Sequence, residues 1–532
     1  MDAMQGTLGW PLARAMKVYG DVEALVDDTN RWTYREWGRR ILGLGAGLRS
    51  LGLDDGSIVA CLMNNSTRHL EYWMAVPAAG LVLNDLNFRL APAELEFIVN
   101  DCGATTIATD AAFLRVAEQL MERCPTLQHL VYADTTGEAP SGSHRHDHLC
   151  TYEPLSREIT DRIGNDTLAA ICYTGGTTGL PKGVMQSHAN QLANAKHVIS
   201  VMGFQPGERY VHAAPMFHAA DVASTYAATW AGATHLIIPG FEPGRFCDVA
   251  EKERMTVTLL VPTMINMLVN HPGVEDRDFS AWRLLAYGAS PMPAELQRRA
   301  MALFPCGFMQ LYGMTEACPL LTCCTVDDHR RGMAGEAGYV ERLKSAGAPV
   351  AGVETEVRRE DGVTLCAPGE PGEVYARGPN IMLGYWNRPE ETAHALVGNG
   401  WYRSGDVAYS DAHGYLYIVD RAKDMIISGG ENVYTTEVEN AVYSHPAVLE
   451  AAAFGIPHDT WGEAVHVEVV LRPGATVTEA ELIAHCRTLI GGYKVPRSVG
   501  LRTDPLPKSG AAKILKRELR DPFWAGRNRA VN

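Results

Sequence analysis

Short apolar segments alternate with amphipathic ones along roughly the first 420 residues, and this alternation limits the fold more than any other feature. Residues 51–63 read as a turn and then a strand, Ser66–Ala79 as a helix and Thr105–Thr109 as another short strand. Strands that alternate with helices form α/β layers with largely parallel sheets. The sequence therefore predicts an α/β protein with a large N-terminal domain of layered β-sheets flanked by helices.

The pattern changes near Val419, where the polar segment Asp420–Asp424 separates two apolar runs. The chain beyond it reads as a compact α+β unit of about 110 residues, a usual domain size. Its predicted helices are Thr436–Tyr443 and Thr478–Leu489, and its predicted strands are Val448–Phe454 and Val465–Leu471. We predict domains at residues 1–419 and 425–532, joined by a hinge at 420–424.

Charge and composition exclude several classes of partner. The net charge of -15 argues against binding to nucleic acid or to anionic lipid. The longest apolar stretch, Met74–Leu83, is too short to span a bilayer, and no N-terminal signal is visible. The 12 cysteines include no Cys-x-x-Cys pair, which favours reduced, mostly buried thiols. We expect a cytoplasmic protein without a membrane span.

A histidine-rich segment is a candidate metal site. His144, His146, Asp147, His148 and Cys150 follow a loop-like stretch at residues 136–143. Structural zinc sites need a second ligand cluster with regular spacing, and none is visible. A solvated loop that binds metal only adventitiously is the favoured interpretation, and the sequence leaves metal binding open.

The glycines at 43, 45 and 47 suggest a dinucleotide-binding fingerprint only superficially. The third glycine falls one residue early and no strand precedes the segment. We interpret Thr33–Leu51 instead as an amphipathic helix with small residues on one face.

A glycine- and threonine-rich loop, Thr174–Val184, follows the apolar strand Leu168–Tyr173. It supplies backbone N–H groups, hydroxyls and Lys182, which together suit a polyphosphate. It is not a Walker A loop, because Gly183 rather than a hydroxyl residue follows the lysine. The interpretation is a triphosphate-binding loop; a merely flexible turn is the alternative for this loop taken alone.

Further motifs follow in a fixed order, and together they resemble the adenylate-forming enzymes: acyl-CoA synthetases, firefly luciferase and the adenylation domains of peptide synthetases. The match is closest to the fatty-acid and medium-chain acyl-CoA ligases. The motifs are Thr174–Val184, Ala214–His218, Gly288–Ser290, Leu311–Glu316, Tyr402–Asp406, Asp420–Arg421 and Leu506–Lys516.

The resemblance implies an ATP site with Mg²⁺ held by Thr174 and Glu316. It places Tyr312 on adenine, Thr315 on the α-phosphate, Asp406 and Arg421 at the ribose and His218 beside the acyl carboxylate. These residue types suit the chemistry, because an aromatic face stacks on a purine and a carboxylate is a hard ligand for Mg²⁺. The remaining nucleotide contacts implied are Gly175, Gly176, Thr177, Thr178, Gly179, Lys182, Gly288, Ala289, Ser290, Gly313 and Met314.

The resemblance also implies a mobile C-terminal domain that rotates about Lys423. Lys513 would be the catalytic lysine of adenylation, although Ala512 stands where the family usually has glycine. After rotation, Gly429 and Gly430 would border a channel for the pantetheine of CoA. Lys494 or Arg497 could meet CoA phosphates, or either could be a solvated surface charge.

The function implied is ATP-dependent activation of a carboxylic acid to an acyl-adenylate, followed by transfer to CoA, as in fatty acid metabolism. An amide ligase that uses an amine in place of CoA shares every adenylation motif; an oxygenase of the luciferase type and a sensor without turnover are further alternatives. Small residues at His218–Ala220 and Ala286–Gly288 suggest a hydrophobic monocarboxylate, with Asp221 serving structure. A homodimer is compatible with the resemblance.

Overall fold

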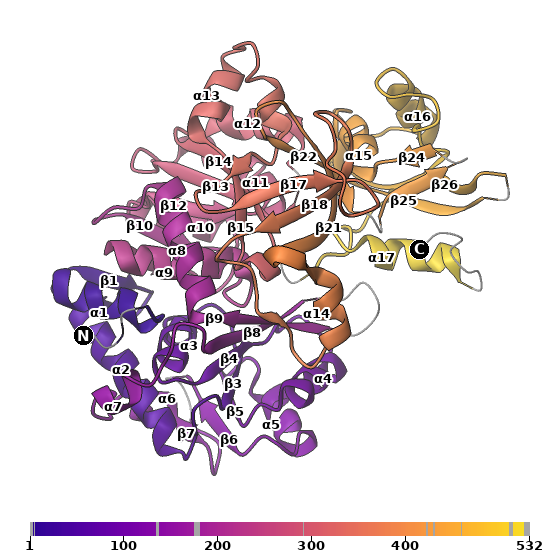
Figure 1. Cartoon of the computed structure of the whole chain (residues 1–532). Coiled ribbons are helices and arrows are strands. Elements are labelled where there is room, and N and C mark those ends of the chain that lie inside the picture. The colour runs from indigo at the N-terminus through magenta and orange to yellow at the C-terminus, as the bar shows by residue number, and fades with distance from the viewer. Residues whose placement is uncertain are drawn as a thin grey trace.

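The computed structural model describes residues 4, 6–134, 138–174, 181–290, 292–421, 424–428, 431–458, 460–509 and 514–525. These residues form a large N-terminal region built on three sheets and a smaller C-terminal region built on one, and they confirm the predicted α/β class (Figure 1). No helix within these ranges combines the length and the apolar character that a bilayer crossing requires.

The first large sheet has the strand order β16-β15-β14-β13-β12-β10-β11-β1-β2. Neighbours from β13 through β12, β10 and β11 to β1 are parallel, whereas β2, β15 and β16 pair antiparallel at the ends. The strands are β1 (Glu23–Val26), β2 (Arg31–Thr33), β10 (Arg209–His212), β11 (Thr234–Ile237), β12 (Val257–Leu260), β13 (Leu284–Gly288), β14 (Gly307–Gly313), β15 (Leu320–Cys324) and β16 (Ala348–Pro349).

The second large sheet has the order β19-β9-β8-β4-β3-β5-β6-β7. Its edge strand β19 comes from a segment nearly two hundred residues after β9, so a distant part of the chain closes this edge. The strands are β3 (Ile58–Leu62), β4 (Val82–Asp85), β5 (Thr106–Thr109), β6 (His129–Tyr132), β7 (His144–Arg145), β8 (Leu168–Thr174), β9 (Lys182–Ser187) and β19 (Gly384–Tyr385).

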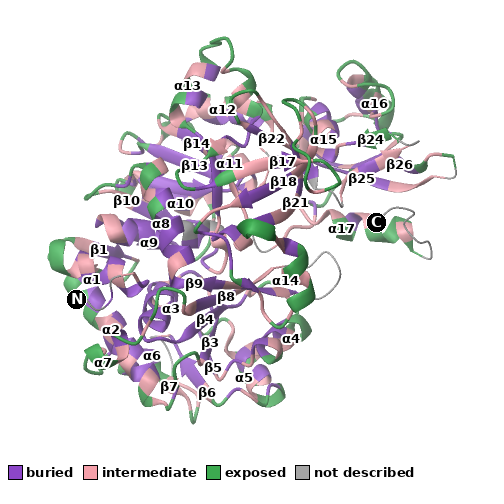
Figure 2. Cartoon of the chain, viewed as in Figure 1, coloured by how far each residue is buried: buried purple, intermediate pink, exposed green. Residues whose placement is uncertain are grey.

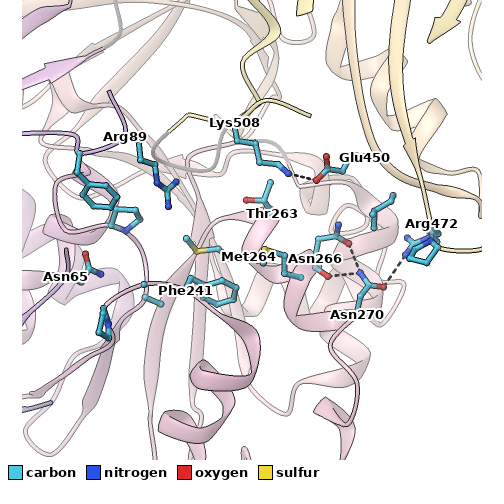
Figure 3. Close-up of a pocket in the computed structure, with 18 residues that line it drawn as sticks. Asn65, Arg89, Phe241, Thr263, Met264, Asn266, Asn270, Glu450, Arg472 and Lys508 are labelled. Carbon is cyan, nitrogen blue, oxygen red and sulfur yellow. Dashed lines mark hydrogen bonds and ion pairs between the residues drawn. The ribbon is translucent and has the colours of Figure 1, made fainter. Parts of the chain in front are cut away.

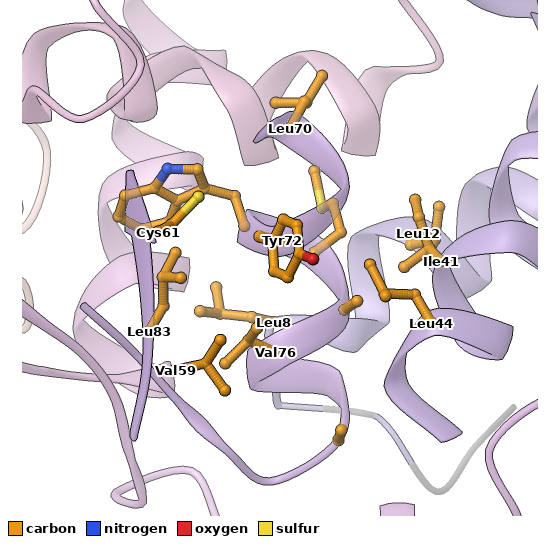
Figure 4. Packing of buried hydrophobic residues seen from close by; sticks show 14 of the residues in the cluster. Leu8, Leu12, Ile41, Leu44, Val59, Cys61, Leu70, Tyr72, Val76 and Leu83 are labelled. Carbon is orange, nitrogen blue, oxygen red and sulfur yellow. The ribbon is translucent and has the colours of Figure 1, made fainter. Parts of the chain in front are cut away.

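Helices fill both sides of the large sheets because the parallel strands are buried on both faces. In β3, Val59 and Cys61 face one core cluster while Ile58, Ala60 and Leu62 face another, as the two-residue period of a strand requires. Figure 4 shows the first cluster, in which α1, α2 and α3 pack against β3 and β4. Figure 2 shows the central strands buried and the outer helix faces exposed.

The helices of the N-terminal region begin and end as follows: α1 (Gly9–Val18), α2 (Tyr34–Ser50), α3 (Thr67–Ala78), α4 (Pro92–Cys102), α5 (Leu114–Arg123), α6 (His146–Leu149), α7 (Arg157–Thr160), α8 (His188–Met202), α9 (Ala219–Ala231), α10 (Pro243–Lys252), α11 (Pro262–Val269), α12 (Ala294–Leu303), α13 (Val326–Met333) and α14 (Pro389–Ala395), with short 3₁₀ turns η2 (Val274–Asp276), η3 (Thr315–Ala317), η4 (Glu341–Lys344) and η5 (Gly398–Gly400).

The predicted helix at Thr33–Leu51 is α2, with Thr33 and Glu36 forming a capping box at its start. Its glycines are packing residues. A Cβ on Gly43 would lie 2.3 Å from the carbonyl oxygen of Cys150, and one on Gly47 would lie 2.6 Å from that of Leu149. The glycines therefore let α6 and the residue after it approach α2 closely, which excludes the dinucleotide interpretation for this segment.

A third sheet links the two large ones to the C-terminal region. It has the order β17-β18-β21-β20, with β22 paired to β21. Its strands are β17 (Glu354–Arg358), β18 (Gly372–Arg377), β20 (Leu396–Val397), β21 (Trp401–Ser410) and β22 (Leu416–Arg421).

The chain changes sheet after β22. The fourth sheet runs β24-β23-β26-β25, with β27 parallel to β26, and two helices complete its core with α17 after it. This change falls between Arg421 and Ile426 and overlaps the predicted boundary at 420–424; the domain boundary and its action as a hinge stay predictions. The elements are β23 (Ile426–Ser428), β24 (Glu431–Val433), α15 (Thr435–Tyr443), β25 (Val448–His458), β26 (Gly462–Leu471), α16 (Glu479–Arg487), β27 (Ser498–Arg502) and α17 (Lys516–Trp524), close to the predicted ranges.

Candidate active site

Tyr312, the predicted adenine-binding residue, is the next-to-last residue of strand β14 in the first large sheet. The hydroxyl of Tyr312 donates a hydrogen bond of 2.7 Å to Oδ2 of Asp406, which lies buried on β21 of the third sheet. Two predicted nucleotide contacts, far apart in the sequence, thus lie side by side. The backbone of Arg421 pairs with Asp406 in the same sheet, which also brings the predicted ribose residues together.

The turn at Gly288–Ser290 packs against the same strand. Gly288 pairs with Leu311, and a Cβ on it would lie 2.1 Å from the Leu311 carbonyl oxygen. Ala289 follows with φ of 66°, a conformation that a residue other than glycine rarely adopts. Close approach to β14 therefore requires glycine at position 288, opposite Leu311, the residue before Tyr312; the role of this turn at adenine stays a prediction.

Glu316, the predicted metal ligand, is half-buried in the 3₁₀ turn that follows β14. Its Oε1 accepts a hydrogen bond of 3.0 Å from the hydroxyl of Tyr385, and its backbone oxygen accepts one of 2.8 Å from the N–H of Met382. Burial and the Glu316 carboxylate together raise the pKa of Tyr385, so this phenol remains a donor at neutral pH. The Tyr385 hydroxyl therefore orients the carboxylate, and the Met382 N–H holds the backbone of the turn.

The phosphate loop begins and ends on paired strands. Thr174, the last residue of β8, lies opposite Lys182, the first residue of β9, and the glycines and threonines 175–179 between them lie outside the described residues. The ammonium of Lys182 lies 5.4 Å from the ring centre of Tyr385. In the same strand, Nε2 of Gln186 donates 2.7 Å to the backbone oxygen of Thr315. Strand β9 therefore contacts both the loop and the Thr315–Glu316 segment.

The donor set at this junction fits Mg²⁺. Thr174 offers a hydroxyl and Glu316 a carboxylate, and Mg²⁺ prefers hard oxygen ligands completed by substrate phosphates and water. Glu316 has one oxygen bonded to Tyr385, and a carboxylate has further acceptor positions. The residues present can therefore hold the ion together with a triphosphate.

His218 directly precedes α9, where its backbone oxygen accepts the N–H of Asp221 at 3.0 Å. The Asp221 side chain is buried, and its Oδ2 lies 2.7 Å from Nδ1 of His212. His212 in turn contacts His235 at 2.9 Å, whose pKa is well below the ordinary value because of burial and the neighbouring imidazole. The Asp221 side chain thus links the first turn of α9 to His212 at the end of β10, a structural contact.

A cavity of about 640 Å³ opens where the two regions meet (Figure 3). Its N-terminal wall includes Asn65, Phe88, Pro215, Phe241 and Met264, and is largely apolar. The C-terminal region contributes Leu449, Glu450, Arg472, Pro473 and Lys508, and Arg89 adds a further cation; the other lining residues are Ala213, Pro239, Gly240, Thr263, Asn266, Met267 and Asn270.

Hydrogen bonds between described residues cross this junction. The guanidinium of Arg472 donates 3.1 Å to Oδ1 of Asn270, and that of Arg89 donates 3.4 Å to the backbone oxygen of Ser509. The hairpin that leads to Lys513 therefore faces the N-terminal region. Lys513, Lys423, Gly429 and Gly430 themselves lie outside the described residues, so their predicted roles stay predictions.

Several expectations need correction. Tyr287 belongs to the core, where its hydroxyl lies 2.7 Å from Nε2 of His329, so this part of the predicted acid pocket is absent from the cavity lining. Lys494 forms an ion pair of 2.7 Å with Glu437, and the guanidinium of Arg497 lies 4.4 Å from the ring centre of Trp461. Both cations therefore have partners within the C-terminal region.

The histidine-rich segment is not a solvated loop at every position. His146 and Cys150 are buried, and Nε2 of His146 lies 2.7 Å from Oε2 of Glu71. Arg40 binds Glu71 at 2.8 Å and Asp147 at 3.0 Å. The ligand atoms of Glu71, His146 and Cys150 lie within 4.8 Å of one another, but Arg40 and His146 already bind both Glu71 oxygens. The cluster is best described as a buried ion-pair network.

Sequence reasoning missed three residues that the structure places at the site. Tyr385 contacts Glu316, Arg89 contacts the lysine hairpin, and the side-chain amide of Asn65 donates 2.8 Å to the Ala214 backbone oxygen beside His218. Only Asn65 carried a usable signal, since it follows a predicted parallel strand at the edge where sites form. Tyr385 and Arg89 lie in segments without a motif.

Fold and site together define a nucleotide-binding enzyme of two parts. The AMP-binding enzyme family model matches residues 12–386, and that of the AMP-binding enzyme C-terminal domain matches 437–513. The chain therefore belongs to the AMP-binding enzymes. Members of this family that form acyl-CoA use ATP, Mg²⁺ and CoA.

Individual relatives match nearly the whole chain. It is 37% identical to feruloyl-CoA synthase of an Amycolatopsis species, over 98% of this chain and 99% of the relative. It is 34% identical to a long-chain-fatty-acid–CoA ligase of Escherichia coli O157:H7, over 94% of this chain and 92% of that ligase. Among solved structures, the amide bond synthetase McbA from Marinactinospora thermotolerans is similar with a TM-score of 0.86 and 29% identity, over 97% of this chain and 100% of McbA.

Proposed function

We propose that the protein is an AMP-forming acid–CoA ligase. It activates a hydrophobic monocarboxylic acid with ATP to an acyl-adenylate and then transfers the acyl group to CoA, releasing AMP and pyrophosphate. The observation that carries the proposal is the cavity between the two regions, which combines an apolar wall beside Pro215 with three cationic side chains. The similarity to feruloyl-CoA synthase and to a fatty-acid ligase supports it.

Adenylation requires a carboxylate to approach the α-phosphorus of a polyanion. Two like unit charges at about 4 Å repel by roughly 4 kcal/mol at an effective dielectric of 20. Lys182 and the N–H groups of the loop after Thr174 would hold the phosphates, Tyr312 and Asp406 the nucleoside, and Lys513 the charge that develops between acid and phosphate. Mg²⁺ on Thr174 and Glu316 would offset part of the repulsion when bound. Catalysis then rests on positioning and electrostatics.

The second substrate is proposed to enter between the two regions. Arg89, Arg472 and Lys508 give the cavity three cations against the single carboxylate of Glu450. Burial lowers the pKa of Arg89, and burial together with the nearby Arg299 lowers that of Arg472, so an anionic ligand would stabilise both. A polyanion with a thiol arm, such as CoA, fits these cations better than a small amine does.

The proposed acid is apolar because the wall that faces these cations is apolar. Phe88 contacts Phe217 edge to face at 5.0 Å between ring centres, and Phe241 and Met264 continue the surface. Aromatic and thioether side chains suit an aryl or medium aliphatic acid. Lys508 and Arg472 belong to the C-terminal part of the lining, whereas Arg89 comes from the N-terminal region, with its guanidinium 5.6 Å from the ring centre of Phe88 (Figure 3).

The alternative is an amide ligase that uses an amine as acceptor. The structural similarity to the amide bond synthetase McbA supports this alternative. A direct test incubates the protein and ATP with a panel of aliphatic and aryl acids and with either CoA or amines. We expect AMP and an acyl-CoA for a hydrophobic monocarboxylate, measured by pyrophosphate release and mass spectrometry. Amide products without CoA turnover would replace the proposal by the alternative.

A further inference from the structure

The segment that leads to Lys513 and away from it forms a hairpin. The N–H of Leu515 donates 2.8 Å to the backbone oxygen of Pro507, and Lys508 pairs with Ile514 in an antiparallel bridge. In the sequence, Lys513 directly precedes Ile514, which is one of the two residues of that bridge. Whatever holds the two arms of this hairpin therefore limits where the side chain of Lys513 can reach.

The first arm is attached to Glu450 on β25. The carboxylate of Glu450 pairs with the ammonium of Lys508 and also accepts the N–H of Leu506 at 2.9 Å. Leu506 is buried in a small apolar cluster with Phe454 and Leu519. One carboxylate thus binds two positions of the arm, and Figure 3 shows the Lys508 side chain directed towards it above the cavity.

The second arm is attached to α15 through Lys516. Its ammonium lies 2.7 Å from Oε1 of Glu439 and donates 2.5 Å to the hydroxyl of Thr435. Oε1 of Glu439 is itself fixed by the N–H of Ala453 at 2.8 Å. Thr435 is in turn bound by Asp420, whose Oδ2 accepts its N–H at 2.7 Å. The second arm is therefore connected to the end of β22, next to the predicted hinge.

The placement of Lys516 is electrostatically unusual. It is the first residue of α17, where the helix dipole disfavours a cation. Burial works to lower the pKa of its ammonium, but Glu439 and Asp420 outweigh burial and raise that pKa. A buried ion pair adds little net stability compared with apolar residues of similar volume. What the pair does provide is a defined position for the start of the helix and for the arm before it.

We infer that Lys508 and Lys516 are positioning residues for adenylation, which hold the two arms of the hairpin so that Lys513 is presented to the acid and the α-phosphate. The inference rests on the proposed function, since it needs Lys513 to act in that step. A displacement of about 1 Å in a group that stabilises a transition state can reduce the rate about 100-fold. Loss of either clamp therefore acts on the adenylation rate rather than on binding of ATP.

The test uses the full chain with the double variant Lys516→Met and Glu439→Gln, which removes both charges of the buried ion pair together. Adenylation is measured as acid-dependent ATP–pyrophosphate exchange, and the second step as CoA thioester formation from synthetic acyl-adenylate. We expect kcat for exchange to fall about 10- to 100-fold, with KM for ATP and the thioester rate within about 2-fold. The matched control is Arg517→Met, which removes an exposed ion pair with Asp521 on the same helix and leaves both steps unchanged.

Equal losses in both steps, or unchanged exchange, would overturn the inference. If the double variant is too unstable to assay, Glu450→Gln tests the first arm by ATP–pyrophosphate exchange alone, because Glu450 also lines the cavity proposed for CoA; we expect kcat for exchange to fall about 10-fold, and unchanged exchange would overturn the inference. Lys513→Ala is run in parallel. If it retains exchange, the proposed function of that lysine fails; if it loses exchange while both clamp variants keep it, only the positioning role fails.

Discussion

The hydroxyl of Tyr385 donates a hydrogen bond of 3.0 Å to Oε1 of Glu316 and so joins the edge strand β19 to the proposed metal ligand. The ring of the same tyrosine lies beside the ammonium of Lys182. One side chain thus contacts both the strand proposed to bind phosphate and the turn proposed to bind the metal. No motif pointed to it, and its position depends on the pairing of β19 with β9.

Replacement of Tyr385 by Phe is expected to weaken use of the metal. The variant keeps the ring but leaves the Glu316 carboxylate without this donor, and a hydrogen bond to a charged group contributes about 1.5–3 kcal/mol. We expect the Mg²⁺ concentration for half-maximal pyrophosphate release to rise about 10-fold at fixed ATP. Tyr417→Phe, on β22 outside the site, is the control, and an unchanged Mg²⁺ requirement in the Tyr385 variant would contradict the assignment.

Loss of the Asp406 carboxylate is expected to weaken nucleotide binding. Asp406→Ala removes the proposed ribose acceptor and the partner of the Tyr312 hydroxyl, which should raise KM for ATP by about 10- to 100-fold. Tyr312→Phe separates the two effects, because it keeps the aromatic face for adenine. We expect it to change KM by less than about 3-fold; steady-state kinetics with equal effects of both variants would argue against a ribose contact.

Lys513→Ala is expected to abolish adenylation while ATP still binds. The lysine is proposed to stabilise charge that develops only in the transition state, and such a group affects kcat far more than substrate affinity. Pyrophosphate release measures the first property and equilibrium dialysis with ATP the second. Normal pyrophosphate release by the variant would refute the catalytic role.

Lys423→Pro is expected to damage thioester formation more than adenylation. Proline fixes φ, and the second step is the one for which we propose that the C-terminal region rotates about this residue. The two half-reactions are measured separately, as for the clamp variants. Equal loss of both steps would count against a hinge at this position.

The free energy of unfolding is expected to fall with acid partly because of His188. Its Nδ1 accepts the N–H of Leu8 at 3.0 Å, and burial lowers its pKa from 6.5 to about 4. Below pH 6.5 the unfolded chain takes up a proton that the folded chain rejects, so stability present above pH 6.5 is lost as pH falls towards 4. By pH 5 the loss is about 2 kcal/mol.

The matched measurement is chemical denaturation of the wild type and of His188→Asn at pH 7.5 and pH 5. Asn keeps an acceptor for the N–H of Leu8 but cannot take up the proton. We expect the variant to lose less stability than the wild type between the two pH values. Equal losses would show that another group accounts for this part of the acid sensitivity.

The sequence predicted the elements whose signals are local. Helix α2 has its capping box at Thr33 and Glu36, β8 is an apolar run before a glycine loop, and the fourth sheet follows alternating apolar residues. The motif residues Tyr312 and Asp406, which were assigned to one nucleotide site, lie in hydrogen-bond contact. Their meeting needed the family resemblance, because residues on different sheets have no common period in the sequence.

The errors concern residues whose neighbours are distant in the chain. His146 was placed in a solvated loop because the segment is polar. In the structure it is buried and binds Glu71, which Arg40 also binds. The resemblance placed the acid pocket near the end of the strand Ala286–Gly288, and the strand period turns the side chain of Tyr287 into a hydrophobic core cluster instead. Local patterns specify which residues share a face, and tertiary pairing decides what that face meets.

The thiols of the molecule have a practical consequence. Of the free cysteines, nine are buried, and only Cys172, Cys306 and Cys366 are partly accessible. Burial raises the pKa of Cys306 to about 12 and also raises that of Cys366, so even these react slowly with alkylating agents at neutral pH. A cysteine introduced on the outer face of α16 would therefore react with a thiol-directed fluorophore faster than the native thiols do. Movement of the C-terminal region could then be followed without first replacing the native cysteines.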